Sequence, residues 1–274
     1  MNPFRQLLRA AGKSPPLGTW ISSASPLVAE AVGHAGFDWG VIDMEHSPLD
    51  LMGVVHLLQA LGNTRLVPVV RVPWNDAVTT KRVLDAGAET VMFPFVQNAE
   101  EAAHAVAATR YPPEGVRGMA GMTRADGYGS RPDHFSNANR RIAVVVQLET
   151  PQALAALDSI AAVPGVDALF IGPADLSGAM GLPGQTMHAD VMASMTRAAR
   201  RGLEIGLPVG TIGGTPEQVA RYRAAGFSFL AINSDIGLLV RGARDALAAL
   251  HGQEAPPHVH TLTAGTDPEE REPR

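Results

Sequence analysis

The chain contains no cysteine, and this absence excludes both a disulfide framework and thiol chemistry. We expect a cytoplasmic protein, since a chain without cysteine needs no oxidising compartment. Lysine is almost as scarce, because Lys13 and Lys81 are the only lysines. Lys13 precedes the first predicted strand and Lys81 lies in a polar helical stretch. Neither is placed to form a Schiff base at a reacting centre, so imine catalysis is not expected.

The chain also lacks an excess of basic residues and long apolar runs. Its formal net charge of -5 argues against nucleic acid as a partner, because phosphate binding needs a basic surface. No uninterrupted apolar stretch is long enough to cross a bilayer, and residues 1–17 lack the apolar core of a secretory signal. We therefore expect a soluble protein without a membrane partner.

Short apolar, β-branched runs alternate with Ala-rich helical patterns along the chain. The predicted strands cover residues 17–21, 39–42, 66–70, 90–93, 142–148, 168–171, 208–211 and 229–232. The helical patterns cover residues 26–33, 49–61, 76–86, 99–110, 152–161, 189–202, 216–225 and 236–251. Several of these patterns close on glycine, at Gly62, Gly87, Gly202 and Gly226. Such near-continuous apolar strands predict a parallel sheet covered on both faces.

Eight strand–helix units are the number that closes a TIM (β/α)8 barrel, an α/β fold that forms a single domain. The competing architecture is an open, doubly wound sheet, which usually carries a glycine-rich fingerprint after its first strand. The segment Trp20-Ile-Ser-Ser-Ala24 offers none. We therefore predict a barrel domain over residues 1–251. Residues 252–274 are rich in Pro, Glu and Thr without periodicity, which predicts a disordered tail.

One long connection interrupts the alternation. Residues 111–141, between the fourth and fifth predicted strands, are rich in Pro, Gly, Arg and Asp. A loop of that length inside a compact domain is usually functional or disordered. Its arginines and the Gly127-Tyr128-Gly129 run favour an ordered lid or a subunit contact, and a solvated loop is the alternative.

Four neighbouring strands end in polar residues, and in a barrel the chemistry takes place at the C-terminal strand ends. These residues are Asp43 and His46 after the second strand, Arg71 after the third, Gln147 and Glu149 at the fifth, and Asp175 after the sixth. Gln147 and Glu149 are two residues apart, so both point into the mouth of the barrel. A base, an arginine and two carboxylates at adjoining strand ends indicate an active site.

Glu149 and Asp175 are the predicted metal ligands. Each follows a buried strand without a nearby lysine, and carboxylate oxygens favour a hard divalent cation. A metal held by two side chains keeps most of its coordination sphere open for water or substrate, which Mg²⁺ and Mn²⁺ tolerate. Co²⁺ is a further candidate. Structural zinc is not expected, because cysteines and paired histidines at ligand spacing are absent.

The segment 172–175, Gly-Pro-Ala-Asp, opens a predicted helix whose free N–H groups attract anions. Because proline has no N–H, Ala174 and Asp175 must be the donors. A 2-oxo acid fits: its carboxylate meets these amides while its keto and carboxylate oxygens chelate the metal. Arg71 would face the negative charge that develops on the keto oxygen, and His46 is the candidate base.

With these segments in place, the chain resembles the HpcH/HpaI aldolases, the metal-dependent class II pyruvate aldolases. The segments that carry the resemblance are GFDWGVIDMEH (36–46), VRVPW (70–74), LDAGA (84–88), PPEGVRG (112–118), QLET (147–150) and FIGPADLS (170–177). Their order and spacing cover residues 15–250. The resemblance implies a TIM barrel in which Glu149 and Asp175 hold the metal.

The same resemblance implies further roles. His46 is the acid/base and Arg71 stabilises the enolate. Asp85 raises the basicity of His46, although Asp43, as the carboxylate nearest in sequence, is the alternative partner. The implied substrate-binding residues are Gln147, Gly172, Ala174 and Asp175.

The activity so predicted is the reversible cleavage of a 4-hydroxy-2-oxo acid to pyruvate and an aldehyde. Candidate substrates are 4-hydroxy-2-oxoheptanedioate and 2-dehydro-3-deoxy sugar acids, and the resemblance suggests a homo-oligomer, a hexamer. One alternative is a metal-dependent lyase or mutase acting on a phosphorylated or acyl-CoA substrate, which predicts more basic residues at the mouth than Arg71. The other is a barrel that binds a 2-oxo acid without turnover, against which the complete set of acid, base and ligands speaks.

Overall fold

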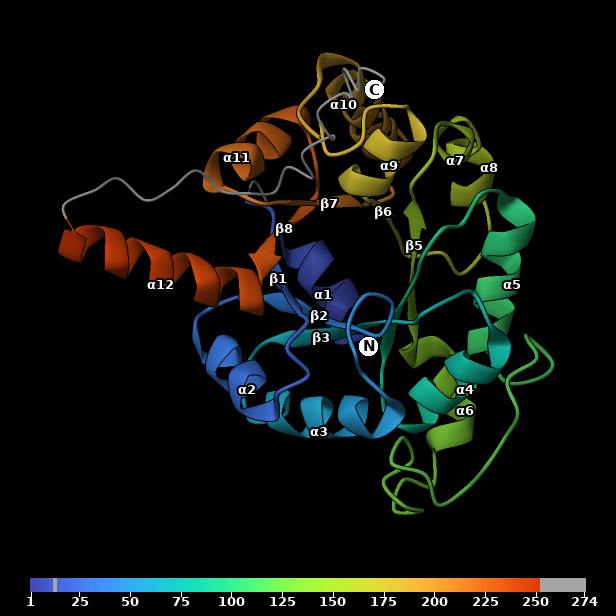
Figure 1. Cartoon of the computed structure of the whole chain (residues 1–274). Coiled ribbons are helices and arrows are strands. Elements are labelled where there is room, and N and C mark those ends of the chain that lie inside the picture. Colours follow the sequence, from blue (N-terminus) through green and yellow to red (C-terminus); the bar gives the residue numbers. More distant parts are fainter. Residues whose placement is uncertain (12–13, 252–274) are drawn as a thin grey trace, which may run out of the picture.

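The computed structural model describes residues 1–11 and 14–251, and its centre is a closed barrel of parallel strands (Figure 1). The strands are β1 (Leu17–Ile21), β2 (Trp39–Asp43), β3 (Val67–Arg71), β4 (Thr90–Phe93), β5 (Ala143–Leu148), β6 (Ala168–Ile171), β7 (Val209–Gly213) and β8 (Phe229–Ser234). Each strand pairs with its neighbours in sequence, and β8 pairs with β1. The predicted eight-stranded barrel is confirmed, and the open sheet is excluded.

Helices surround this barrel on its outside (Figure 1). They are α1 (Pro3–Ala10), α2 (Pro26–His34), α3 (Leu51–Leu61), α4 (Ala77–Asp85), α5 (Ala99–Thr109), α6 (His134–Arg141), α7 (Pro151–Ala155), α8 (Leu157–Ala161), α9 (Pro173–Ala179), α10 (Ala189–Ile205), α11 (Pro216–Ala225) and α12 (Asp235–His251). Most of them begin with a side-chain cap, as Asp76 shows by accepting hydrogen bonds from the backbone N–H groups of Val78 and Thr79.

Three helical predictions need correction. The pattern over residues 152–161 forms two short helices, α7 and α8, which are separated at Ala156. The pattern over 189–202 does not end at Gly202, because α10 continues to Ile205 and stops at Gly206 in the left-handed conformation (φ 72°). Gly202 instead allows close packing, since a Cβ there would lie 2.2 Å from Val209 Cγ2. The 111–141 connection contains α6 and is not a plain loop.

The barrel interior is filled by side chains that alternate with outward-facing ones along each strand. This interior cluster includes Trp20, Trp39, Val41, Val69, Met92, Val145, Phe170 and Phe229. Phe4 of α1, a helix that we did not predict, closes the cluster from below and packs edge-on against Trp39 and Phe229. The interior is therefore a packed core, and the same alternation sends the next inward residues of β2, β3 and β5 to the open mouth.

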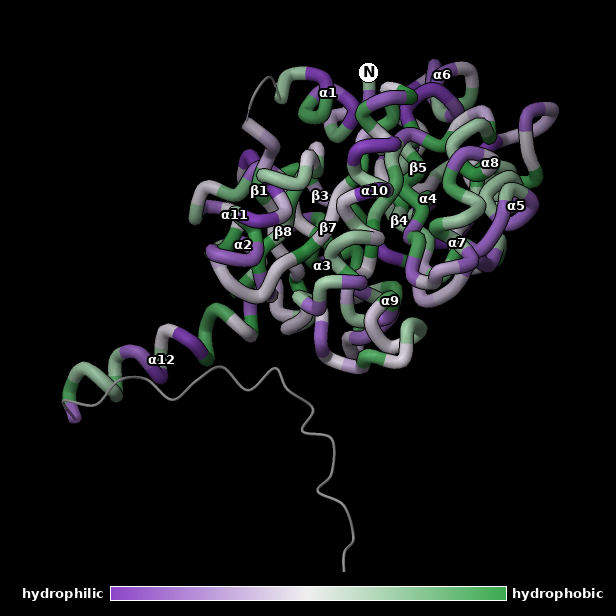
Figure 2. The backbone as a smooth tube through the Cα atoms, turned by 90° about the horizontal axis from the view of Figure 1, so that it is seen from above, coloured by the Kyte–Doolittle hydropathy of each residue, from purple (hydrophilic) through white to green (hydrophobic). Residues whose placement is uncertain are grey.

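The last helix stands apart from the rest. Figures 1 and 2 both show α12 projecting away from the barrel. Of its residues only Asp235 is buried, and its carboxylate accepts hydrogen bonds from the N–H groups of Ser22 and Ser23. Within the described ranges, no helix combines the length and apolar character that crossing a bilayer requires. The predicted disordered tail, with His258 and His260, lies outside the described residues.

Candidate active site

Strands β2 and β3 end side by side in a buried ion pair. Asp43 and Arg71 are register partners at the last positions of their strands. The Arg71 Nε and Nη2 atoms donate to the two carboxylate oxygens of Asp43 at 2.9 and 2.8 Å, which is the bidentate geometry of a strong pair. The guanidinium also lies 5.6 Å from the Trp20 ring centroid. Arg71 is therefore held rigidly at the mouth of the barrel.

Glu45 is a member of this site to which the sequence analysis assigned no role. Its Oε2 lies 2.7 Å from Arg71 Nη1, and its Oε1 lies 3.8 Å from His46 Nε2. Burial raises the pKa of Glu45, while Arg71 and His46 act in the opposite direction. Its position directly before the predicted base was visible in the sequence, but its contact with Arg71 was not.

His46, the predicted base, is largely exposed, with 66% of its side chain accessible. It follows β2 in a turn that is held by Asp43, whose Oδ1 accepts the N–H groups of Glu45 (3.0 Å) and His46 (3.4 Å). Asp43 therefore fixes the backbone at His46 as well as the guanidinium of Arg71, and the side-chain neighbour of His46 is Glu45. An exposed imidazole beside the mouth can reach a bound molecule.

Glu149 extends beyond β5 and is 2% exposed. Its Oε2 accepts the N–H of Phe95 at 2.9 Å, and its Oε1 accepts Gln147 Nε2 at 2.9 Å. Burial and the nearby charge of Asp175 raise the pKa of Glu149 to about 7. Gln147 Oε1, also buried, has no partner within the described residues. Gln147 thus leaves one buried acceptor at the mouth that a bound ligand would satisfy.

Gly172 leaves space for Glu149. A Cβ at this position would lie 2.5 Å from Glu149 Oε1. Directly after it, α9 begins at Pro173 with Ala174 and Asp175 exposed in its first turn. The first N–H groups of a helix have no partner within the helix, so this turn offers donors next to Glu149.

The carboxylates at this mouth outnumber the cations. The negative charge of Asp175 raises the pKa of both Glu149 and Glu45, while Arg71 is already shared between Asp43 and Glu45. Such uncompensated negative charge suits a divalent cation. No group of three or more His, Cys, Asp or Glu side chains in the described part of the chain is placed to hold a metal. The residues present therefore fit a cation that takes few protein ligands.

Asp85 lies away from these residues in the structure. It ends α4, which runs back toward the N-terminal ends of the strands, and its carboxylate accepts Arg117 Nη2 at 2.7 Å. Within one chain this is the opposite end of the barrel from His46. The structure thus brings together His46, Arg71, Gln147, Glu149, Gly172, Ala174, Asp175 and Asp43, but not Asp85.

Two exposed aromatic rings border the mouth and were not predicted. Trp74 and Phe95 are stacked with ring centroids 6.2 Å apart, and 58% and 40% of these residues are exposed. Phe95 has a positive φ of 55°, an uncommon conformation for a non-glycine residue. It is this residue whose N–H binds Glu149. The apolar rings therefore form a wall beside the buried carboxylate.

Comparisons with known proteins agree with this arrangement. The family model described as HpcH/HpaI aldolase/citrate lyase matches residues 17–242. The chain is 48% identical to 2-dehydro-3,6-dideoxy-6-sulfogluconate aldolase of Pseudomonas putida, over 91% of this chain and 98% of that protein. It is 44% identical to hydroxypyruvate/pyruvate aldolase of Paraburkholderia phytofirmans, over 90% and 96%. The crystal structure of an HpcH/HpaI aldolase/citrate lyase family protein from Burkholderia cenocepacia has a TM-score of 0.88 and 42% identity, covering 92% of this chain and 100% of that chain.

Proposed function

The chain belongs to the HpcH/HpaI aldolase/citrate lyase family, and on this premise we propose that it is a divalent-metal-dependent aldolase. Its curated relatives are named as aldolases, and the enzyme itself is of the aldolase type. The finer proposal is the reversible cleavage of a 4-hydroxy-2-oxo acid to pyruvate and an aldehyde. The observation that carries it is the buried carboxylate of Glu149, which the Phe95 N–H and the Gln147 amide hold at 2.9 Å each at the mouth of the barrel, near the charge of Asp175.

Glu149 and Asp175 are the proposed ligands of the metal, with Mg²⁺, Mn²⁺ and Co²⁺ as the candidates. When bound, such a cation polarises the keto group of a 2-oxo acid and offsets negative charge on its oxygen. Glu149 is already oriented by Gln147 and Phe95, so it needs little rearrangement to act as a ligand. Gln147 Oε1 and the N–H groups of Ala174 and Asp175 remain for the substrate.

The chemistry of cleavage assigns the other residues. His46 takes the proton from the C4 hydroxyl, the C3–C4 bond breaks to release the aldehyde, and its electron pair forms the enolate of pyruvate. Arg71, locked by Asp43, stabilises the oxygen of that enolate. Removing one such preorganised donor typically lowers the rate by about 100- to 1,000-fold. Protonation of the enolate at C3 then gives pyruvate.

The part of the substrate that leaves as the aldehyde is proposed from the names of the relatives and from the aromatic residues that border the mouth. One relative is named for a sulfogluconate substrate and another for 5-keto-4-deoxy-D-glucarate. We propose a 2-dehydro-3-deoxy sugar acid as the substrate class. The stacked Trp74 and Phe95 support this assignment, because an aromatic face can pack against the C–H groups of an extended chain.

A homo-oligomer completes the proposal. Helix α12 exposes an apolar stripe at helical spacing: Ile236, Leu239, Val240, Leu247 and Leu250. Exposed apolar patches of this kind mark interaction sites, and a second copy is the proposed occupant. A contact between Asp85 and His46 would also require a second copy, because one chain places them at opposite ends of the barrel. The hexamer suggested by resemblance is part of this proposal.

The test is a panel of 4-hydroxy-2-oxo acids assayed for pyruvate after removal of metal with EDTA. We expect activity to disappear and to return with Mg²⁺, Mn²⁺ or Co²⁺. Borohydride added with pyruvate should leave the enzyme active, since no lysine forms an imine. Full activity in EDTA, or a borohydride-trapped lysine adduct, would overturn the proposed mechanism. Turnover of phosphoenolpyruvate or acyl-CoA without aldol cleavage would overturn the substrate class.

A further inference from the structure

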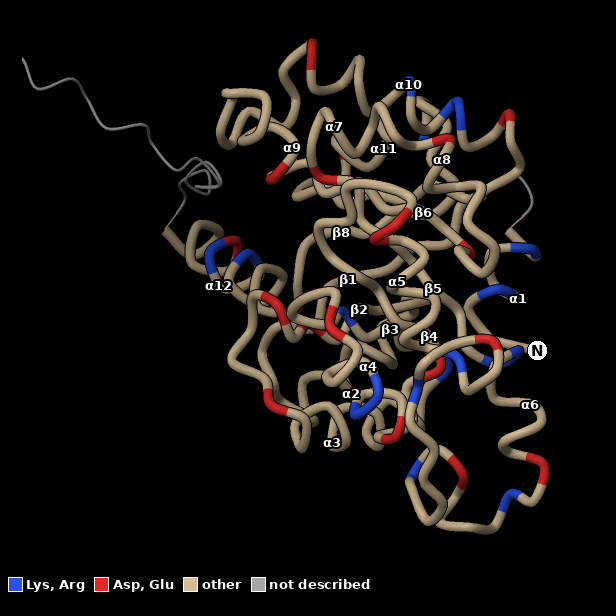
Figure 3. The backbone as a smooth tube through the Cα atoms, turned by 90° about the vertical axis from the view of Figure 1, so that its right-hand side faces the viewer, with Lys and Arg blue, Asp and Glu red and all other residues tan. Residues whose placement is uncertain are grey.

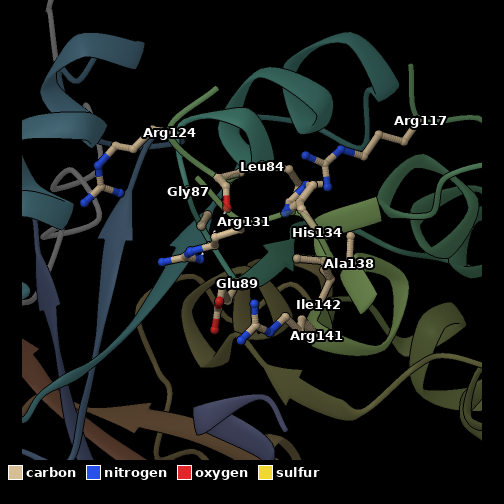
Figure 4. A pocket seen from close by; sticks show the side chains of 12 residues that line it. Leu84, Gly87, Glu89, Arg117, Arg124, Arg131, His134, Ala138, Arg141 and Ile142 are labelled. Carbon is tan, nitrogen blue, oxygen red and sulfur yellow. Dashed lines mark hydrogen bonds between the residues drawn. The ribbon is translucent and has the colours of Figure 1, made fainter. Parts of the chain in front are cut away.

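A cavity with a volume of about 280 Å³ is lined by residues that do not belong to the candidate active site (Figure 4). It is lined by the end of α4, the turn into β4, the segment before α6, and α6 itself. Glu89 leads into the N-terminal end of β4, and Ile142 leads into that of β5. The cavity therefore opens at the end of the barrel opposite the mouth that carries Glu149.

Its lining is strongly basic in a chain whose net charge is -5. The charged residues that line it are Arg117, Arg124, Arg131, Arg141 and Glu89. Figure 3 shows further basic segments on the same side of the molecule, near α1 and α6. Four guanidinium groups thus share one cavity with a single carboxylate.

Most of these guanidinium groups lack a counter-charge. Arg117 pairs with Asp85. Within the described residues, the other three arginines form no ion pair within 4 Å, and Glu89 forms none either. Arg124 Nη1 donates to the carbonyl of Ala86 at 3.0 Å, and Arg131 Nη1 donates weakly to that of Ala125 at 3.4 Å. Three guanidinium groups without an ion pair therefore lie around a cavity that has one carboxylate in its lining, and a bound anion would offset their mutual repulsion.

Arg117 adds an independent indication. Only 2% of this residue is exposed, and its guanidinium lies 4.4 Å from the Tyr111 ring centroid. Its Nε has no hydrogen-bond partner within the described residues, although a buried donor left unpaired is costly. Figure 4 shows the Arg117 side chain reaching in among the other lining residues. The Arg117 guanidinium is thus paired through Nη2 and keeps one buried donor, Nε, without an acceptor in the wall of the cavity.

The arginines also act on a histidine in the same wall. His134 is buried, with Nε2 3.3 Å from the Tyr111 hydroxyl. Burial lowers its pKa, the charges of Arg117, Arg131 and Arg141 lower it further, and the charge of Asp126 acts in the opposite direction. Their positive fields thus converge at His134. At neutral pH the imidazole is uncharged and offers one donor and one acceptor.

We propose that this cavity is a binding site for a small oxyanion-bearing metabolite, whose phosphate or carboxylate group is held by Arg131 and Arg141. The planar fork of arginine matches the oxygen spacing of both groups. A cavity of this size takes a ligand of a few carbon atoms, near the lower limit for small-molecule sites. Within one chain the proposal does not depend on the aldolase chemistry, because Arg131 and Arg141 do not lie at the mouth that carries Glu149.

Calorimetric titration of the full-length chain tests the site, with inorganic phosphate and citrate as probes at constant ionic strength. The wild type is compared with Arg131→Gln and Arg141→Gln, and with Arg197→Gln, an exposed arginine of α10, as the matched control. We expect each cavity variant to bind the preferred probe at least about tenfold more weakly, while the control is unchanged. Because Arg71 is intact in every protein, binding at the active site cancels in this comparison.

The two probes separate the possible sources of the anion. Loss of phosphate binding alone indicates a phosphate ester, and loss of citrate binding alone indicates a polycarboxylate. Equal binding by wild type, cavity variants and control would overturn the proposal. So would a change in assembly mass in Arg131→Gln or Arg141→Gln without any effect on either probe, because a carboxylate of a second copy would then be the occupant. Thermal melts without probe check that each variant is folded.

Discussion

At the scale of single residues, the site depends on a carboxylate that burial keeps partly protonated. The pKa of Glu149 is raised from 4.5 to about 7, so the folded state binds its proton more tightly than the unfolded state. In metal-free protein its contribution to stability is complete below pH 4.5 and is lost as the pH rises through 7. A shift of this size corresponds to about 3 kcal/mol.

We therefore expect Glu149→Gln to stabilise the metal-free protein progressively above pH 4.5, by up to about 3 kcal/mol at pH 8. Gln147 can turn its amide to accept from the new side chain, since its Oε1 is unpartnered. The same change should abolish Mg²⁺ binding and cleavage. Urea unfolding between pH 5 and 8, with and without Mg²⁺, measures this. Parallel pH dependence in both proteins would show that burial does not raise this pKa.

The buried bidentate ion pair between Asp43 and Arg71 leads to a second prediction. Asp43→Asn removes one of the two carboxylates that pair with a guanidinium whose side chain is only 8% exposed, so we expect the unfolding free energy to fall by about 3 kcal/mol. Release of Arg71 from its position should lower kcat by about 100-fold. Chemical unfolding and steady-state kinetics measure the two effects.

The control is Asp158→Asn, which disrupts a similar fork to Arg201 at the exposed surface. Stability and kcat should change little there, because solvent screens exposed pairs. Equal effects at the two positions would contradict the role assigned to burial.

The sequence predicted most of this site, since the strand ends were recognisable from apolar runs that stop at polar residues. Glu45 was missed because its contact with Arg71 depends on how the turn after β2 folds back, which spacing along the chain does not reveal. The exposed pair of Trp74 and Phe95 was missed for a similar reason. Its two rings come from the turns after β3 and β4 and meet only when these neighbouring strands are paired in register.

At the scale of elements, the turn between β6 and α9 leaves room for the Glu149 carboxylate because Gly172 has no side chain. Gly172 has an ordinary negative φ of -82°, so alanine is permitted by the backbone and excluded only by Glu149 Oε1. We expect Gly172→Ala to displace that carboxylate and to weaken Mg²⁺ binding by about 10- to 100-fold. Metal titration followed by calorimetry is the measurement.

Gly178 of the same helix supplies the matched control, because a Cβ there would meet nothing within 4 Å. Gly178→Ala should leave metal binding unchanged and raise the unfolding free energy by up to about 1 kcal/mol, as expected for a helix interior. If both alanines weakened the metal equally, the close approach at Gly172 would not be the cause.

Element boundaries followed from the sequence to within a few residues, because strands and helices have distinct apolar periods. The exceptions have physical reasons. Gly202 looked like a helix end but serves the packing of α10 on β7, a tertiary requirement. Helix α1 has a cap at Asn2 and a first-turn proline, signals that were present but not used.

At the scale of the whole molecule, α12 makes a prediction about assembly. Leu239 is 68% exposed on the apolar stripe of this projecting helix. We expect Leu239→Glu to dissociate the oligomer, because a charge cannot be buried there without a partner. Leu203→Glu, at a similarly exposed leucine of α10 (59%), should not. Sedimentation velocity measures the masses, and a wild type that is monomeric at all concentrations would refute the prediction.

Helix α1 contacts parts of the chain that are far apart in the sequence. Asn2 Nδ2 donates to the carbonyls of Glu89 and Arg141, Arg5 pairs with Asp167, and Phe4 rests on Phe229. These partners exist as one surface only after the last strand has joined the first. Helix α1 can therefore make all of these contacts at once only on a closed barrel, so its docking reports that the eight strands have come together.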